Sequence, residues 1–111
     1  MTNLYDETIN SLKSEGKSMD DIVWVGCDDF AILLEDFIEV AKQTDYDDTF
    51  GCQHIATDLK IVGKDFVMLR KEYDGAEWWE YISFIHPIPS KTMVIKRLEG
   101  EYEPSLGQLN K

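Results

Sequence analysis

An Asp-Gly dipeptide at positions 74 and 75 separates two runs of strand-forming residues, 65–73 and 76–85. A two-residue hairpin turn requires positive φ at both central positions, and Asp followed by Gly meets that requirement well. The pattern therefore predicts an antiparallel hairpin. Its predicted pairs are Tyr73 with Ala76, Arg70 with Trp79 and Met68 with Tyr81.

Two further strands are predicted to extend this hairpin into an antiparallel meander. One covers residues 55–62 and reaches the hairpin through a two-residue turn at 63–64, which places Ile61 opposite Phe66. The other covers residues 92–98 and follows a proline-containing break. The second half of the chain is therefore expected to be mostly β-structure.

The first half of the chain has a different pattern. In order, it predicts a helix over 4–14, a short strand over 22–25, a helix over 29–43 and a loop over 44–51. Gly26 is expected to stop the strand, and the carboxylate of Asp28 or Asp29 to accept from free N–H groups at the start of the second helix.

Helices first and strands second predict an α+β fold. Two N-terminal helices, with a short strand between them, are expected to pack on a C-terminal antiparallel meander of three to four strands. Residues 1–98 are expected to form a single domain, and residues 99–111 a poorly ordered C-terminal tail.

The two faces of the predicted meander are both apolar. Side chains alternate across a strand, so the adjacent Trp78 and Trp79 must lie on opposite faces. One face is expected to carry Leu59, Ile61, Phe66, Met68, Arg70, Trp79 and Tyr81, and the other Val67, Leu69, Lys71, Tyr73, Trp78, Ile82 and Phe84. Either the two helices cover one face each, or one face is left for a partner or a second copy of the chain.

The composition limits the class of protein. The 111 residues are 43% hydrophobic and 12% aromatic, which predicts one compact domain with a real core. Only Cys27 and Cys52 are present, so a disulfide framework is not expected, and a reduced cytoplasm is the expected location. The N-terminal residues are unlike a secretory signal, and no apolar run approaches the roughly 20 residues that span a bilayer.

The net charge of −11 is concentrated in one region. Residues 20–48 contain one base, Lys42, and ten acids, which are Asp20, Asp21, Asp28, Asp29, Glu35, Asp36, Glu39, Asp45, Asp47 and Asp48. These acids form either a solvated surface that keeps the protein soluble or a surface that binds a basic partner. Direct binding to nucleic acid or to an anionic membrane is not expected, because like charges repel.

No metal, cofactor or phosphate motif is complete. Cys27, Cys52, His54 and His86 lack the paired spacing of a closed zinc site. A calcium loop that began at Asp45 would need Gly at its sixth position and Glu at its twelfth, but the chain has Phe50 and Ala56 there. The Gly-Lys-Ser sequence at 16–18 lacks the first glycine of a phosphate-binding loop. Neither a metal nor a cofactor is therefore expected.

Catalytic residues cannot be assigned either. Cys52 and His54 could share one face of an extended segment, but no third group completes a nucleophilic site. The 22 acids will form several close pairs by chance, so no catalytic carboxylate pair can be singled out. The expected class is a binding protein and not an enzyme.

An aromatic cluster is the remaining feature. It consists of Arg70, Tyr73, Trp78, Trp79 and Tyr81. It is interpreted either as core packing, with Arg70 stacked on Trp79, or as a contact patch for a partner, because Trp, Tyr and Arg dominate the energetics of protein interfaces.

Three segments carry a resemblance to other proteins. They are GKSMDDIVWVG (16–26), YDDTFGCQHIATDLKIVGKDF (46–66) and EYDGAEWWEY (72–81). They resemble a family of small proteins from phages and mobile elements of Firmicutes-type bacteria, over roughly residues 10–85. The resemblance implies a small accessory protein inside a bacterial cell and assigns no catalytic residue.

Three functions follow as hypotheses. The first is a non-catalytic inhibitor or decoy whose acidic surface engages a basic, nucleic-acid-handling protein. The second is a protein–protein adaptor or homodimer that uses the aromatic sheet face. The third is a small-ligand binder or an enzyme of unassigned type, which a deep pocket or a bound metal would favour.

Overall fold

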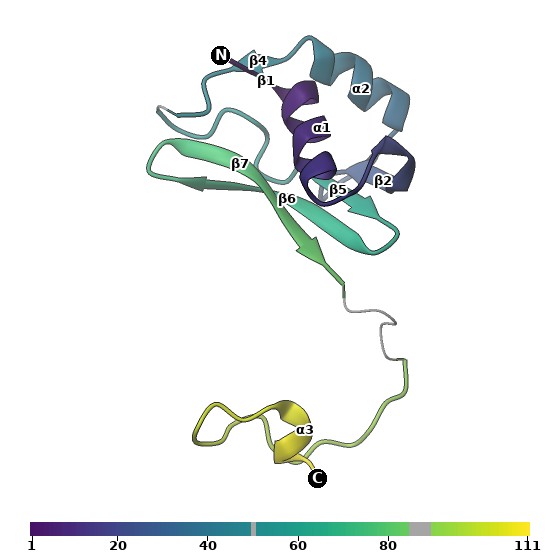
Figure 1. Cartoon of the computed structure of the whole chain (residues 1–111), viewed down its shortest axis with the longest axis vertical. Helices are drawn as coiled ribbons and strands as arrows, with labels where there is room; N and C mark the ends of the chain where they lie inside the picture. Colours follow the sequence, from purple (N-terminus) through teal and green to yellow (C-terminus); the bar gives the residue numbers. More distant parts are fainter. Residues whose placement is uncertain (50, 85–89) are drawn as a thin grey trace.

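Two helices lie on one face of an antiparallel sheet in the computed structural model, which describes residues 1–49, 51–84 and 90–111 (Figure 1). The helices of this layer are α1 (Leu4–Ser14) and α2 (Leu34–Lys42). The five strands, in sheet order, are β3 (Ala31–Ile32), β2 (Ile22–Gly26), β5 (Lys60–Gly63), β6 (Phe66–Tyr73) and β7 (Ala76–Ser83). The predicted α+β class is confirmed, but the arrangement differs in detail.

The remaining elements are short. They are β1 (Thr2–Asn3), which pairs with β4 (Asp45–Tyr46), the 3-10 helix η1 (Met19–Asp21) and α3 (Leu106–Leu109). The short strand β4 lies inside the segment predicted as a loop over 44–51. The helix predicted over 4–14 is confirmed as α1, and the Asn3 side chain caps it by accepting from the Asp6 N–H at 3.1 Å.

The predicted hairpin is confirmed in turn type and in register. Asp74 has φ +50° and Gly75 has φ +89°, as the two-residue turn requires. Across the β6–β7 pair, Tyr73 lies opposite Ala76, Arg70 opposite Trp79, and Met68 opposite Tyr81.

The predicted pairing of the preceding strand is wrong by two residues. β5 begins at Lys60 and not at residue 55, and Ile61 lies opposite Met68 and not opposite Phe66. The Phe66 ring packs against Gly63 so closely that a Cβ on Gly63 would come within 2.0–2.5 Å of three ring carbons. The pair closest to the turn is Val62 with Val67, so the connection between the paired residues is longer than two residues. A shift of two residues preserves the faces, so the predicted division of the side chains still holds.

The helix predicted over 29–43 begins later than expected. The Cys27 N–H donates to the Phe30 carbonyl at 2.9 Å and closes a turn, after which β3 pairs with β2. Asp28 and Asp29 lie in this turn and do not cap α2, whose N-cap is Leu33 without a side-chain hydrogen bond. The turn and the pairing of β3 with β2 therefore replace the helix over residues 29–33, the first five of the predicted helix.

The prediction of a strand over 92–98 is wrong. The described residues from Ser90 to Ser105 contain no helix or strand. Within the predicted tail, 99–111, α3 is capped reciprocally by Ser105 and Gln108. Figure 1 shows the segment 90–111 standing apart from the sheet and its helices.

The hydrophobic core lies between the helices and one face of the sheet. Its most buried apolar side chains are Leu12, Val25, Ile61, Phe66 and Met68. The helices cover only this face. Of the two arrangements that the sequence left open, the structure shows the one in which the described residues leave the second sheet face uncovered (Figure 1).

Candidate functional site

The ten acids predicted to bind a partner lie in four places. Asp20 and Asp21 are in η1, Asp28 and Asp29 in the β2–β3 turn, Glu35, Asp36 and Glu39 on α2, and Asp45, Asp47 and Asp48 in β4 and the loop after it. All of them are exposed except Asp21 and Asp48, which are partly buried.

Four of these ten carboxylates have local structural partners. Asp21 accepts from the Ser18 N–H at 2.9 Å, and Asp45 accepts from the Asn3 side-chain amide at 2.9 Å. Asp28 forms an ion pair with Lys60, and Asp47 accepts from the backbone N–H and the hydroxyl of Thr49. These acids therefore contribute to capping, turns and strand contacts.

A different subset is free to meet a partner. Asp20, Asp29, Glu35, Asp36 and Glu39 are exposed, and in the described part of the chain their carboxylates form no hydrogen bond or ion pair. Glu35 and Asp36 lie in the first turn of α2, where a negative charge interacts favourably with the helix dipole. We refer to Glu35, Asp36 and Glu39 on α2, together with Asp29 in the preceding β2–β3 turn, as the α2 acidic surface.

A shallow apolar hollow adjoins this surface. It has a volume of about 230 Å³ and is lined by Leu4, Ile32, Asp36, Phe37, Val40, Ala41, Thr44 and Leu59. Asp36 is the carboxylate in this lining, and Glu35 and Glu39 are on the same helix. An apolar hollow bordered by negative charge can take an apolar side chain, or the aliphatic stem of a lysine or arginine, from a basic partner.

The two hydrogen bonds from Thr49 lower the pKa of Asp47 below its ordinary value of 3.8. A carboxylate with a lowered pKa stabilises the fold at pH values above the unfolded-state pKa. That contribution is lost as the pH falls through the lower, folded-state pKa. An NMR titration is expected to place the Asp47 inflection below 3.8, and Thr49→Ala is expected to move it upward. An inflection that Thr49→Ala leaves unchanged would contradict this contact.

The five residues of the predicted aromatic patch are not on one surface. Arg70 and Trp79 are 6% and 5% exposed and lie on the core face, where Tyr81 stacks on Phe66 with ring centroids 4.9 Å apart. Tyr73 and Trp78 lie on the opposite face and are 76% and 42% exposed. Of the five residues of this patch, Tyr73 and Trp78 are therefore the two that are exposed to a partner.

Arg70 is the centre of a buried network. Its guanidinium donates to Glu7 at 3.1 Å, to Glu77 at 3.0 Å and to the Tyr46 hydroxyl at 2.9 Å. Its central carbon lies 4.8 Å from the centroid of the Trp79 ring, so the expected cation–π stacking is present. Burial alone would lower the pKa of Arg70, but Glu7, Glu77 and Tyr46 together raise it.

The partners of Arg70 extend the network across the fold. Glu77 also accepts from the backbone N–H groups of His54 and Ile55, and the Tyr46 hydroxyl donates to Glu7. Burial and the bond to Glu7 raise the pKa of Tyr46. The network joins α1, β4, the loop before β5, and the β6–β7 hairpin, so its contacts are those of a core that holds these elements together.

Sequence reasoning missed Glu7, Tyr46 and Glu77 as partners of Arg70. A signal was present for Glu77, because the correctly predicted hairpin register places Glu77 on the same face as Arg70 and Trp79. A carboxylate beside an arginine on a buried face is most often its ion-pair partner. No local pattern points to Glu7 or Tyr46.

The uncovered sheet face carries a row of apolar side chains across four strands. In register these are Trp24, Val62, Val67 and Ile82, and Leu69, Tyr73 and Trp78 lie on the same face. Lys71 and Glu80 form an ion pair of 3.6 Å on this face. We refer to it as the open sheet face; its side chains are mainly apolar, in contrast to the α2 acidic surface.

One group of potential metal ligands is brought together within the described residues. The Cys27 sulfur and carboxylate oxygens of Asp29 and Asp58 all lie within 4.8 Å of one another. Thiolate and carboxylate are ligands that zinc accepts, and three of them would leave one tetrahedral position open. The group includes neither Cys52 nor His54, and His86 lies outside the described residues.

None of the described helices has the length and apolar character needed to cross a membrane. A scan of protein-family models finds no match to this chain, and no curated protein or solved structure is found to match it. The resemblance to small phage and mobile-element proteins therefore stays a prediction. The α2 acidic surface and the open sheet face are the features that bear on function.

Proposed function

We propose that this chain is a non-catalytic binding module whose α2 acidic surface engages a basic protein, in the manner of an inhibitor or decoy. The observation that carries the proposal is that Asp29, Glu35, Asp36 and Glu39 are exposed and form no hydrogen bond or ion pair with the described part of their own chain. A basic protein that handles nucleic acid would meet carboxylates where it otherwise binds phosphates. A bacterial cytoplasm, as the resemblance implies, is the proposed setting.

Electrostatic attraction determines the association rate and the salt dependence of this kind of binding. A chain of net charge −11 attracts a basic partner over a distance of about one Debye length, roughly 10 Å at 0.1 M salt. Association is then fast at low ionic strength and weakens steeply as salt is added. The apolar hollow beside Asp36 offers a place for one anchoring side chain of the partner.

The test starts from a pull-down on bacterial lysate at low and at high salt, with mass spectrometry of the bound proteins. The identified partner is then titrated against the wild-type chain and against Asp29→Asn/Glu35→Gln/Asp36→Asn/Glu39→Gln. The fourfold variant is expected to bind about tenfold or more weakly, because each exposed charge pair contributes up to about 1 kcal/mol. Duplex DNA is expected to compete with the chain for the partner.

A variant with the same loss of charge elsewhere provides the control. Glu72→Gln/Glu99→Gln/Glu101→Gln/Glu103→Gln also removes four exposed carboxylates, and it is expected to keep most of the affinity. Equal weakening by both variants would mean that net charge alone matters. Unchanged binding by the α2 variant would refute the proposal.

A second candidate function is an adaptor that binds an apolar protein surface through the open sheet face. The observation in its favour is the exposure of Trp78 and Tyr73 on a face that the helices do not cover. Such binding should resist high salt and should be lost in a correctly folded Trp78→Ala variant. Binding that disappears at high salt and survives Trp78→Ala would exclude this function.

A further inference from the structure

Among the described residues, the sheet ends at β7, and no strand pairs with the outer edge of β7. β7 is the last strand in the order β3-β2-β5-β6-β7 and pairs only with β6 in the described part of the chain. The beginning of its outer edge is covered, because the Glu77 N–H donates to the Asp48 carbonyl at 2.9 Å. Backbone groups on an open edge can pair with a strand from another chain.

The direction of the Glu77 N–H shows which groups of β7 remain available. In an antiparallel pair, alternate residues direct both backbone polar groups away from the partner strand. Since Glu77 directs its N–H outward, Trp79, Tyr81 and Ser83 do the same, while Phe84 donates inward to Asp65 at 2.8 Å. The free edge therefore presents the N–H and C=O groups of three alternate residues.

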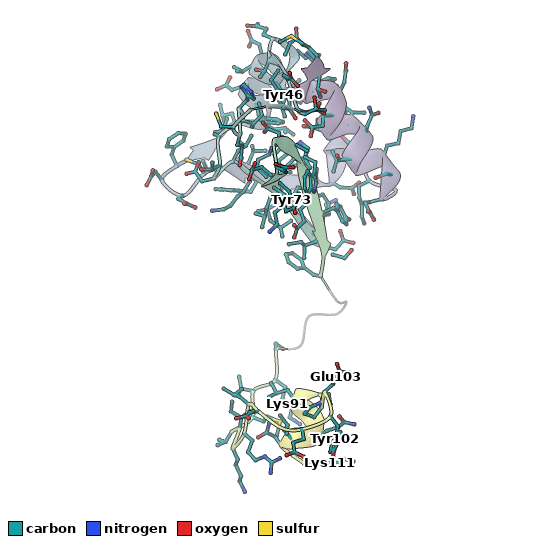
Figure 2. The ribbon with its side chains drawn as sticks, turned by 90° about the vertical axis from the view of Figure 1, so that its left-hand side faces the viewer. Tyr46, Tyr73, Lys91, Tyr102, Glu103 and Lys111 are labelled. Carbon is teal, nitrogen blue, oxygen red and sulfur yellow. The ribbon has the colours of Figure 1, made fainter. Side chains whose placement is uncertain are left out.

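The same chain contains a segment suited to this edge. Residues 92–98, TMVIKRL, are rich in strand-forming residues and form no strand of their own in the structure. The N–H groups of Lys96 and Arg97 donate to the Asn110 side chain at 2.6 and 3.0 Å, so pairing with β7 has to exchange these bonds for main-chain ones. Their apolar side chains are exposed, with Val94 at 88% and Leu98 at 75%. Figure 2 shows Lys91 in the C-terminal segment, well apart from Tyr46 and Tyr73 in the body of the protein.

Charge favours the contact as well. Residues 1–84 contain nineteen acidic and seven basic residues, whereas residues 91–98 contain Lys91, Lys96 and Arg97 and no acid. A strand drawn from 91–98 brings positive charge to a strongly negative body. The attraction partly offsets the repulsion between two chains of net charge −11.

We propose that two copies of this chain exchange C-terminal segments, so that residues 92–98 of each pair with the free edge of β7 in the other. The exchange is reciprocal. Each chain supplies one segment and one β7 edge, so both segments and both edges are paired in a closed two-fold dimer. A second copy is the proposed source because the segment stands apart from its own β7 in both views of the chain (Figures 1 and 2). The added strand supplies main-chain hydrogen bonds in the manner of β-strand addition.

The test measures the molar mass of the full-length chain by light scattering over a range of concentrations. The wild-type chain is expected to dimerise as concentration rises. Ile95→Pro removes an N–H from the middle of the segment and is expected to weaken dimerisation by about tenfold or more. Glu101→Pro places the same residue outside the segment and is expected to leave the dimer unchanged.

Amide hydrogen exchange locates the contact. The N–H groups of Trp79, Tyr81 and Ser83 are expected to gain protection as the dimer forms and to lose it in Ile95→Pro. Protection of these groups in a monomer would show pairing within one chain and overturn the proposal. A dimer that Ile95→Pro leaves intact, with these amides unprotected, would indicate packing of two open sheet faces. A chain that stays monomeric with unprotected edge amides would also overturn it.

Discussion

Replacing Arg70 with alanine is expected to lower the free energy of unfolding by about 3–5 kcal/mol, because the change leaves the buried Glu77 carboxylate and the partly buried Glu7 carboxylate without their cation. Glu77 is 4% exposed and receives its charged hydrogen bond from Arg70. Glu7 and the Tyr46 hydroxyl lose a donor at the same time. Urea denaturation followed by circular dichroism measures the change by linear extrapolation.

The adjacent residue provides a matched control. Lys71 carries the same charge but lies on the open sheet face, where its ion pair with Glu80 is 3.6 Å long and accessible to water. Lys71→Ala is therefore expected to change the stability by about 0.5 kcal/mol or less. Arg70→Lys should fall between the two, because one ammonium cannot reproduce the forked contacts of a guanidinium. An Arg70→Ala variant as stable as Lys71→Ala would contradict the buried network.

Local chemistry explains which elements could be predicted. The Asp74-Gly75 turn requires a backbone conformation that few other dipeptides adopt, so both the hairpin and its register followed from two residues. The helix α1 has an apolar stripe and is followed closely by Glu15 and Gly16, and its bounds agree with the prediction. In both cases the decisive interactions lie within a few residues of one another.

The errors occurred where distant residues decide the structure. Residues 30–33 have helical spacing, yet Ala31 and Ile32 pair with β2 because its edge is available in the folded sheet. The turn after β5 is lengthened by the packing of Phe66 against Gly63 and by a bond from the Lys64 N–H to the Asp21 carbonyl. Neither contact leaves a periodic signal in the sequence.

The sequence predicted which region of the chain is rich in acids, but not which of these acids are free to bind a partner. The excess of acid in residues 20–48 is visible from counting, but counting cannot separate carboxylates with local partners, such as Asp47, from free ones, such as Glu39. The partners of Arg70 show the same limit, since Glu7 and Tyr46 are 63 and 24 residues away from it. Only the folded chain brings these groups together.

The two adjacent tryptophans provide the second large expected effect. Trp79→Ala is expected to cost about 3–5 kcal/mol of stability, as is typical when a buried aromatic side chain is truncated. Trp79 is 5% exposed, donates from its indole nitrogen to the Thr8 hydroxyl at 2.9 Å, and stacks against Arg70. Trp78→Ala removes the same number of atoms from a side chain that is 42% exposed on the other face, and it is expected to cost less than about 1 kcal/mol.

Because the two variants are identical in composition, comparing their unfolding free energies tests the register of the β6–β7 hairpin directly. Strand side chains alternate, so a slip of one residue would turn Trp78 into the core and Trp79 out to solvent. A larger loss for Trp78→Ala would therefore show that the strand is turned over, and with it the positions of Arg70 and Glu77. Equal losses would show that both faces are buried, as in a dimer that packs two open sheet faces. A large loss confined to Trp79→Ala supports one covered face, and it leaves Trp78 free to contact a partner.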